Sequence, residues 1–364
     1  MSKQYEVLYV NPPFPVSARE IGWNDFSESC TYEVCLGNRL ETVSDSLRVF
    51  TPLEISAASY PELDRCELRS LNVPLLKAQL DKLLSFFRPE LRLIWVYDPL
   101  AASLLEQYEK QNLLYDCIDS FRAFSWSYPH IDEAEQKLVT MADVVLVSAQ
   151  ALYDQKSRFN PAVYLVPNAA DFDHFARCGS FAGETDEYKN ITHPRLGFVG
   201  AIYEWIDFGL IDYLAARNPE WNIVLIGPKQ HGLAVPERPN IHWLGIKDYA
   251  LLPFYLQGLD VMLIPFLKNE ITESANPIKM WEYLAAGKPV VSTDIPEVQA
   301  FPNSVWIGRD HEEFSRHCAT VIRLLQDANG ARRISEQARA IARSNTWDNR
   351  CEAIREILKK HFQT

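Results

Sequence analysis

Short apolar runs separated by amphipathic stretches fill the first half of the chain. The runs have the length of buried strands and are bounded by polar or turn residues. They cover residues 5–10, 47–50, 67–71, 91–99, 112–116 and 142–149. Helical periodicity covers 74–87 and 131–141. Strands that alternate with helices predict a doubly wound α/β unit.

A second series with the same rhythm begins at Arg195. Strands are predicted at 196–201, 222–228, 241–245 and 261–266, and helices at 208–217, 249–258, 311–327, 330–344 and 346–362. The stretch between the two series, 177–193, is polar and has no periodicity, which is typical of a linker. The sequence therefore predicts two α/β halves of similar size that face each other across a cleft.

The stretch 276–297 carries the clearest candidate chemistry. Asn276 is predicted to cap a helix with Pro277 at its first position, Gly287 ends it, and 289–292 forms a strand. Lys279 and Glu282 then lie one turn apart on one face. Free N–H groups and a cation suit a diphosphate, and a carboxylate one turn further on suits ribose hydroxyls. The alternative is a solvated helix start with an ordinary surface ion pair.

Composition narrows the class of protein. The chain has 364 residues, 47% hydrophobic residues and a net charge of −12, which are typical of a globular protein and argue against nucleic-acid binding. The longest apolar runs are strand-sized, and no signal peptide is visible. Seven cysteines without a CxxC pair indicate reduced thiols, no zinc site and a cytoplasmic location.

Three features allow two interpretations each. The basic, amphipathic stretch 74–87 suits a helix that covers the sheet or one that lies on a membrane surface. The acidic pair in Asp171-Phe172-Asp173 suits a metal site or an interdomain loop. His130 suits an assisting catalytic role or an ordinary surface position.

Nearly the whole chain resembles the GT-B-fold glycosyltransferases of group 1, and is closest to a branch seen in bacterial exopolysaccharide and teichuronic-acid-type biosynthesis. The resemblance rests on the order and spacing of several segments: YDCIDS (115–120), a Glu followed by ADVVLVSAQAL (135–152), VPNAADFDHF (166–175), GFVGAIYEWID (197–207), VLIGP (224–228) and NPIKMWEYLAAGKPVV (276–291).

The resemblance implies a division into four parts. Residues 1–175 would be an acceptor-binding Rossmann-like domain, 176–193 a linker, and 194–345 a nucleotide-sugar-binding Rossmann-like domain. Residues 346–364 would form a helix that crosses back to the first domain. The fold class is α/β, GT-B, with two Rossmann-like domains.

The resemblance also implies a donor site. Glu282 would accept the ribose hydroxyls, and the helix start would receive the diphosphate. Strand-end loops would line the same pocket, and the loop 244–247 would lie near the base. The residues concerned are Gly200, Gly227, Pro228, Leu244, Lys247, Asn276, Pro277, Ile278, Lys279 and Glu282.

The chain departs from the family pattern at three places. Ser274 stands where the family has a Glu that touches the donor sugar, although Glu273 is adjacent. The Arg–Lys pair that often follows the first strand of the second domain is missing, which leaves Lys279 as the cation for the phosphates. The family's His-Asp pair corresponds to 117–119, where Asp119 remains without the His.

The predicted reaction is transfer of a hexose from a nucleotide-diphosphate sugar, with a UDP-sugar favoured, to a hydroxyl acceptor. The leaving diphosphate needs a fixed cation, supplied by Lys279 without a metal or a separate cofactor. An inverting enzyme also needs a base, for which Asp119 and Asp116 are candidates. The alternatives are a nucleotide-sugar epimerase of the same fold and a non-catalytic nucleotide-sugar-binding protein. The acceptor could be a glycan, a lipid-linked glycan or a small molecule.

Overall fold

The computed structural model describes residues 6–16, 40–85, 93–105, 112–125, 127–302 and 304–362. The chain divides into two compact units. The first comprises Met1–Asp116, Phe124–Val145 and Phe159–Ala162, and the second comprises Cys117–Ala123, Leu146–Arg158 and Val163–Thr364. Within the described part of the chain, no helix is both long enough and apolar enough to cross a membrane. Cys30, Cys35 and the end of the helix predicted at 74–87 lie outside the described residues.

The described first part of the chain is built from short strands and helices of different lengths. The strands are β1 (Val7–Val10), β2 (Phe14–Val16), β3 (Leu40–Ser44), β4 (Leu47–Phe50), β5 (Leu53–Ile55), β6 (Leu93–Val96), β7 (Asn112–Cys117), β8 (Val144–Val147) and β9 (Val163–Leu165). The helices are α2 (Arg65–Ser85), α3 (Ala102–Leu105), α4 (Ile131–Met141) and α5 (Gln150–Lys156). The sheets are β1-β4-β3, β2-β5 and β6-β7-β8-β9.

Helix α2 packs on the first unit through its apolar face. Leu75 is fully buried in a cluster with Leu53 and Ile55 of β5. Two buried amides add specificity: Asn72 accepts from the Ile55 N–H at 2.7 Å, and Gln79 accepts from the Leu53 N–H at 2.8 Å. The covering interpretation of this helix is therefore confirmed for its described part. The strand predicted at 67–71 is wrong, because those residues form the first turns of α2.

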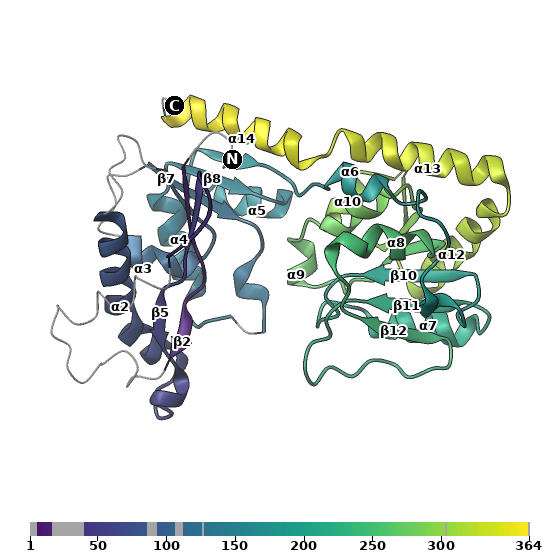
Figure 1. Ribbon diagram of the computed structural model, residues 1–364, viewed down its shortest axis with the longest axis horizontal. Coiled ribbons are helices and arrows are strands. Elements are labelled where there is room, and N and C mark those ends of the chain that lie inside the picture. The colour runs from purple at the N-terminus through teal and green to yellow at the C-terminus, as the bar shows by residue number, and fades with distance from the viewer. Residues whose placement is uncertain are drawn as a thin grey trace. The chain divides into compact units, whose positions relative to one another are not determined.

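The second unit is a parallel sheet surrounded by helices (Figure 1). Its strands are β10 (Arg195–Val199), β11 (Asn222–Ile226), β12 (Ile241–Gly245), β13 (Val261–Ile264), β14 (Val290–Thr293) and β15 (Val305–Gly308). Its helices are α6 (Phe172–Ala176), α7 (Phe208–Arg217), α8 (Leu252–Gln257), α9 (Glu270–Glu273), α10 (Ile278–Ala285), α11 (Pro296–Gln299), α12 (His311–Leu325), α13 (Ala328–Arg343) and α14 (Trp347–Phe362).

The strand order of this sheet locates its crevice. The order is β12-β11-β10-β13-β14-β15, so the chain moves outward from β10 in one direction and then returns to continue from β13 in the other. Every residue of β10, β13 and β14 is buried, as expected for parallel strands covered on both faces. Ligands of open parallel sheets bind outside the carboxyl ends of the strands at such a reversal. The reversal lies between β10 and β13.

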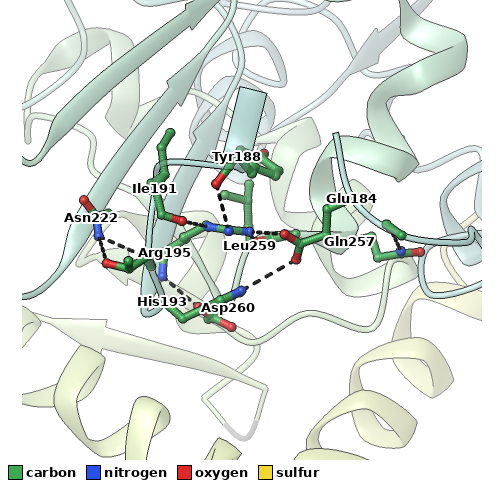
Figure 2. A network of polar contacts seen from close by, with 12 residues as sticks. Glu184, Tyr188, Ile191, His193, Arg195, Asn222, Gln257, Leu259 and Asp260 are labelled. Atoms are coloured by element: carbon green, nitrogen blue, oxygen red, sulfur yellow. Dashed lines mark hydrogen bonds and ion pairs between the residues drawn. The ribbon is translucent and has the colours of Figure 1, made fainter. Parts of the chain in front are cut away.

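The segment 176–193 is not an open linker but packs on the second unit. Tyr188 is buried, and the guanidinium of Arg195 donates to the carbonyl oxygens of Ile191 (2.7 Å), Gly258 (3.0 Å) and Tyr188 (3.2 Å), as well as to Glu184 at 2.8 Å (Figure 2). This packing was not predicted, because one aromatic and one cation, rather than a periodic apolar face, hold the segment in place. The other predicted domain boundaries stay predictions.

Candidate functional site

Two glycines bring the loops after β10 and β11 together at the carboxyl edge of the sheet. Gly200 donates its N–H to the carbonyl of Ile226 at 2.8 Å. Gly227 has φ +146°, and a Cβ on it would lie 1.9 Å from the carbonyl oxygen of Gly200. Only glycine permits both this backbone conformation and this approach. The two loop backbones therefore approach each other closely beside the point where the strand order reverses.

Helix α10 begins one residue later than predicted. Pro277 is its N-cap residue, and no side chain caps the helix start. Asn276 is buried instead, donating to Glu297 at 2.7 Å and accepting from the Trp281 indole at 3.2 Å. The predicted capping role of Asn276 is wrong, because its amide is used to join the loop to the helix body. Gly287, with φ +73°, ends the helix as predicted.

Lys279 and Glu282 form an ion pair on the first turns of α10. The Lys279 Nζ lies 2.7 Å from Glu282 Oε2, and their side chains are 22% and 6% exposed. This burial excludes the alternative of an ordinary surface pair. Burial raises the pKa of the Glu282 carboxyl, against the opposing effects of Lys279 and His174. A Cβ on Gly200 would lie 3.1 Å from Lys279 Cε, so the pair and the glycine loop adjoin.

The buried tyrosine of α10 fixes the helix to the central strand. The Tyr283 hydroxyl accepts from the Val199 N–H at 2.8 Å and donates to the Val199 carbonyl at 3.1 Å. Val199 is the last residue of β10 and immediately precedes Gly200. Since a rigid support is what holds a binding group in place, this link sets the position of Lys279 and Glu282 relative to the loop.

A stacked pair next to Glu282 was missed by the sequence reasoning. The rings of His174 and Tyr249 lie 4.5 Å apart at an interplanar angle of 11°, and His174 Nε2 lies 2.9 Å from the Tyr249 carbonyl oxygen. Burial, with Glu282 and Asp171 nearby, raises the pKa of Tyr249 to about 12. No periodicity marks either residue, because each lies at the start of a short helical segment.

The remaining predicted donor residues line the adjoining strand ends. The Pro228 carbonyl accepts from the Ile202 N–H at 2.8 Å. Leu244 is half-buried at the end of β12, next to Gly245, whose carbonyl accepts from Gly227. Lys247 is turned to Glu187, with its Nζ 2.8 Å from Oε1. Pro228 and Leu244 therefore lie close to the glycine loops, whereas the ammonium of Lys247 has a structural partner.

The two candidate bases lie at the end of β7. Asp116 accepts from the Trp95 indole at 3.1 Å, and Asp119 lies in the loop that follows. Burial raises the pKa of each carboxyl to about 6. Among the residues that the structure describes, no hydrogen bond joins the Asp119 carboxylate to Lys279 or Glu282. A pKa near 6 suits a group that must exchange a proton near neutral pH.

Three further polar residues near helix starts either cap a helix or lie exposed. The Asp171 side chain accepts from the His174 N–H at the start of α6, so the DFD stretch is a helix cap. Asp207 caps α7 and lies 3.0 Å from His311 Nε2. His130 is exposed at the start of α4 and contacts Glu133. In the described part of the chain, no three His, Cys, Asp or Glu side chains are grouped so as to hold a metal ion.

An open cavity of about 590 Å³ extends along the same edge of the sheet. It is lined by the ends of β14 and β15 and by the starts of α7 and α12. Its lining includes the cations Lys268 and Arg309 and the hydroxyl of Thr293. These two cations were not predicted, because they lie in loops without a recognisable motif.

Comparison with known proteins shows which proteins the chain resembles. Residues 193–327 match the family described as Glycosyl transferases group 1. The Bacillus subtilis (strain 168) protein TuaH, whose name assigns it to teichuronic acid biosynthesis as a glycosyltransferase, is 27% identical over 287 residues, which covers 72% of this chain and 68% of TuaH.

Solved structures share the fold. Sucrose-phosphate synthase of Thermosynechococcus elongatus has a TM-score of 0.66 at 15% identity, covering 90% of this chain and 87% of its own. Anabaena HepE, in complex with UDP and glucose, has a TM-score of 0.60 at 16% identity, covering 86% of each chain.

The class of protein follows from these findings. The fold is α/β of the GT-B type, as predicted, and its structural neighbours are glycosyltransferases. Within it, residues 193–327 match the model of the Glycosyl transferases group 1 family. The domain match and the likeness to TuaH together support a glycosyltransferase.

Proposed function

We propose that the chain transfers a hexose from a UDP-sugar to a hydroxyl group of an acceptor in glycan or glycoconjugate biosynthesis. The observation that carries the proposal is the buried Lys279–Glu282 pair at the start of α10, beside Gly200 and the reversal of strand order. The UDP bound to HepE and the biosynthetic role in the name of TuaH favour this donor and this process.

The two charged groups bind different parts of the donor nucleotide. The ammonium of Lys279 and the start of α10 bind the diphosphate, where negative charge grows as the C1–O bond of the donor breaks. The carboxylate of Glu282 accepts hydrogen bonds from the two ribose hydroxyls. Because these residues supply the positive charge themselves, the reaction requires no resident metal.

The acceptor reacts from the other side of the sugar. Its hydroxyl oxygen bonds to C1 of the hexose, UDP leaves, and in an inverting reaction Asp119 takes the hydroxyl proton. A pKa of about 6 leaves most of the Asp119 carboxyl ionised at neutral pH and able to accept it. We place this reaction in the cytoplasm, where nucleotide sugars and the reduced thiols of this chain are both expected.

Calorimetric titration tests the donor site. Parent protein is titrated with UDP, GDP, ADP, uridine and 2′-deoxy-UDP, alongside Lys279→Ala and Glu282→Ala. The expected result is that UDP binds best and that each substitution weakens it tenfold or more. Lys279→Ala should leave uridine affinity within twofold, whereas Glu282→Ala should weaken uridine and remove the preference for UDP over 2′-deoxy-UDP. Lys189→Ala, an exposed cation outside the site, is the matched control.

Two results would overturn the proposal. Failure of every nucleotide to bind the parent would favour a non-catalytic member of the fold. Conversion of a UDP-sugar to its epimer without any acceptor would show an epimerase.

A further inference from the structure

Exposed aromatic side chains gather at strand ends of the first unit. Tyr9 in β1 is 47% exposed, and Tyr97, directly after β6, is 43% exposed. Trp95 lies on β6 two residues before Tyr97, and the two rings are stacked with centroids 6.2 Å apart at an interplanar angle of 26°. Tyr97 is exposed and Trp95 is half-buried, so the stacked pair presents an apolar surface that the core does not cover.

The register of the sheet places a carboxylate beside these rings. Val96 of β6 pairs with Tyr115 of β7, so continuing by one residue sets Tyr97 next to Asp116. Asp116 Oδ2 accepts from the Trp95 indole at 3.1 Å. Partial burial raises the pKa of Tyr97 to about 12, and the nearby Asp116 and Tyr9 add to this rise, which agrees with the placement. We call Tyr9, Trp95, Tyr97 and Asp116 the aromatic platform.

The platform combines the two features that bind a sugar ring. Aromatic faces pack against the C–H face of a pyranose, and a carboxylate accepts hydrogen bonds from its hydroxyls. The indole uses one of about four acceptor positions of the Asp116 carboxylate, so a hydroxyl can be accepted as well. Sites of this kind, apolar with one or two fixed polar groups, are typical of small-molecule recognition.

We propose that the aromatic platform is the acceptor site and that it takes an uncharged pyranose, stacked on Tyr97 and Trp95 with one hydroxyl donating to Asp116. This inference rests on the proposed function, because only a transferase requires a hydroxyl acceptor. The charge on the platform sets the selectivity: the ionised group is a carboxylate, so a uronic acid in the same position would be repelled.

Saccharide binding tests the platform directly. Saturation-transfer NMR titrations follow the methyl β-glycosides of glucose, galactose and N-acetylglucosamine, and methyl β-glucuronide, with and without UDP. We expect at least one neutral glycoside to bind the parent and the glucuronide to bind at least fivefold more weakly than the glucoside. Tyr97→Ala and Asp116→Asn should each weaken the neutral glycoside fivefold or more, while Tyr97→Phe, which keeps the ring, stays within twofold.

The control is Phe159→Ala, which removes another exposed aromatic of the same unit and should leave binding unchanged. UDP affinity, measured on the same variants, should also be unchanged. Absence of binding by every neutral glycoside, or equal loss in Tyr97→Ala and Phe159→Ala, would overturn the platform. Because the titrations are also run without UDP, the saccharide binding can be interpreted even if the protein does not bind UDP.

Discussion

Gly227→Ala tests whether the loop crossing at the carboxyl edge is as tight as the structure has it. The added Cβ would lie 1.9 Å from the Gly200 carbonyl oxygen, on a residue with φ +146°. Holding a non-glycine residue in that region costs about 1–3 kcal/mol. Displacing the packed loop costs about 1–3 kcal/mol more. The free energy of unfolding should therefore fall by about 2–6 kcal/mol.

Gly232→Ala provides the matched control. Gly232 also has positive φ, at +78°, but nothing lies within 4 Å of the position of its Cβ. This substitution should cost only about 1–2 kcal/mol, the backbone penalty alone. Urea denaturation of the three proteins measures the difference, and UDP titration should show weaker binding only for Gly227→Ala.

Equal losses of stability in the two variants would refute the reasoning. In that case the conformation of the backbone alone, and not the approach of the two loops, would require glycine at 227. Unchanged UDP affinity in Gly227→Ala would show that this crossing does not shape the donor site.

Three further predictions concern stability. Arg195→Met should cost about 3–5 kcal/mol because buried carbonyls and Glu184 lose their donor, as measured by urea denaturation and by proteolysis of the segment 176–193. Arg238→Met, at a partly exposed ion pair, should cost much less. Asp207→Ala should cost about 1 kcal/mol by removing the cap of α7, seen as a lower thermal midpoint. In the folded protein, burial raises the pKa of Asp116 from 3.8 to about 6, so the protonated carboxyl favours folding. The free energy of unfolding should therefore fall as the pH rises from about 4 to 6. Asp116→Asn should reduce this fall, as measured by urea denaturation between pH 4 and 8.

The elements of the second unit could be predicted closely from the sequence, because its strands and helices have strong periodicity. Helix α7 at Phe208–Arg217 and strand β12 at Ile241–Gly245 lie where they were predicted. Helix α4 in the first half is also as predicted, at Ile131–Met141. The misplaced features are those fixed by single side chains: the segment 176–193, which Arg195 holds, and the helix start, where Asn276 bonds to Glu297 and Trp281.

Contacts between residues of the candidate site could be predicted only where both residues belong to one sequence motif. Lys279 and Glu282 lie on one helix, so their spacing alone indicated their contact. His174 and Tyr249 lie 75 residues apart in the sequence, and their stacking depends on how α6 and the segment after β12 pack. No local pattern encodes such a pair. The aromatic platform likewise joins strands through register, which periodicity does not specify.

The Lys279–Glu282 pair explains how a buried carboxylate is stabilised in the proposed donor site. A carboxylate as buried as Glu282 would be costly without a partner, and Lys279 supplies one at 2.7 Å. A nucleotide diphosphate offers each group a better partner: phosphate oxygens for the ammonium and ribose hydroxyls for the carboxylate. Binding therefore exchanges one internal ion pair for two sets of ligand contacts and leaves neither charge unpaired. In the proposed function, the pair thus keeps both groups close to the positions in which a nucleotide diphosphate needs them, which lowers the cost of ordering them on binding.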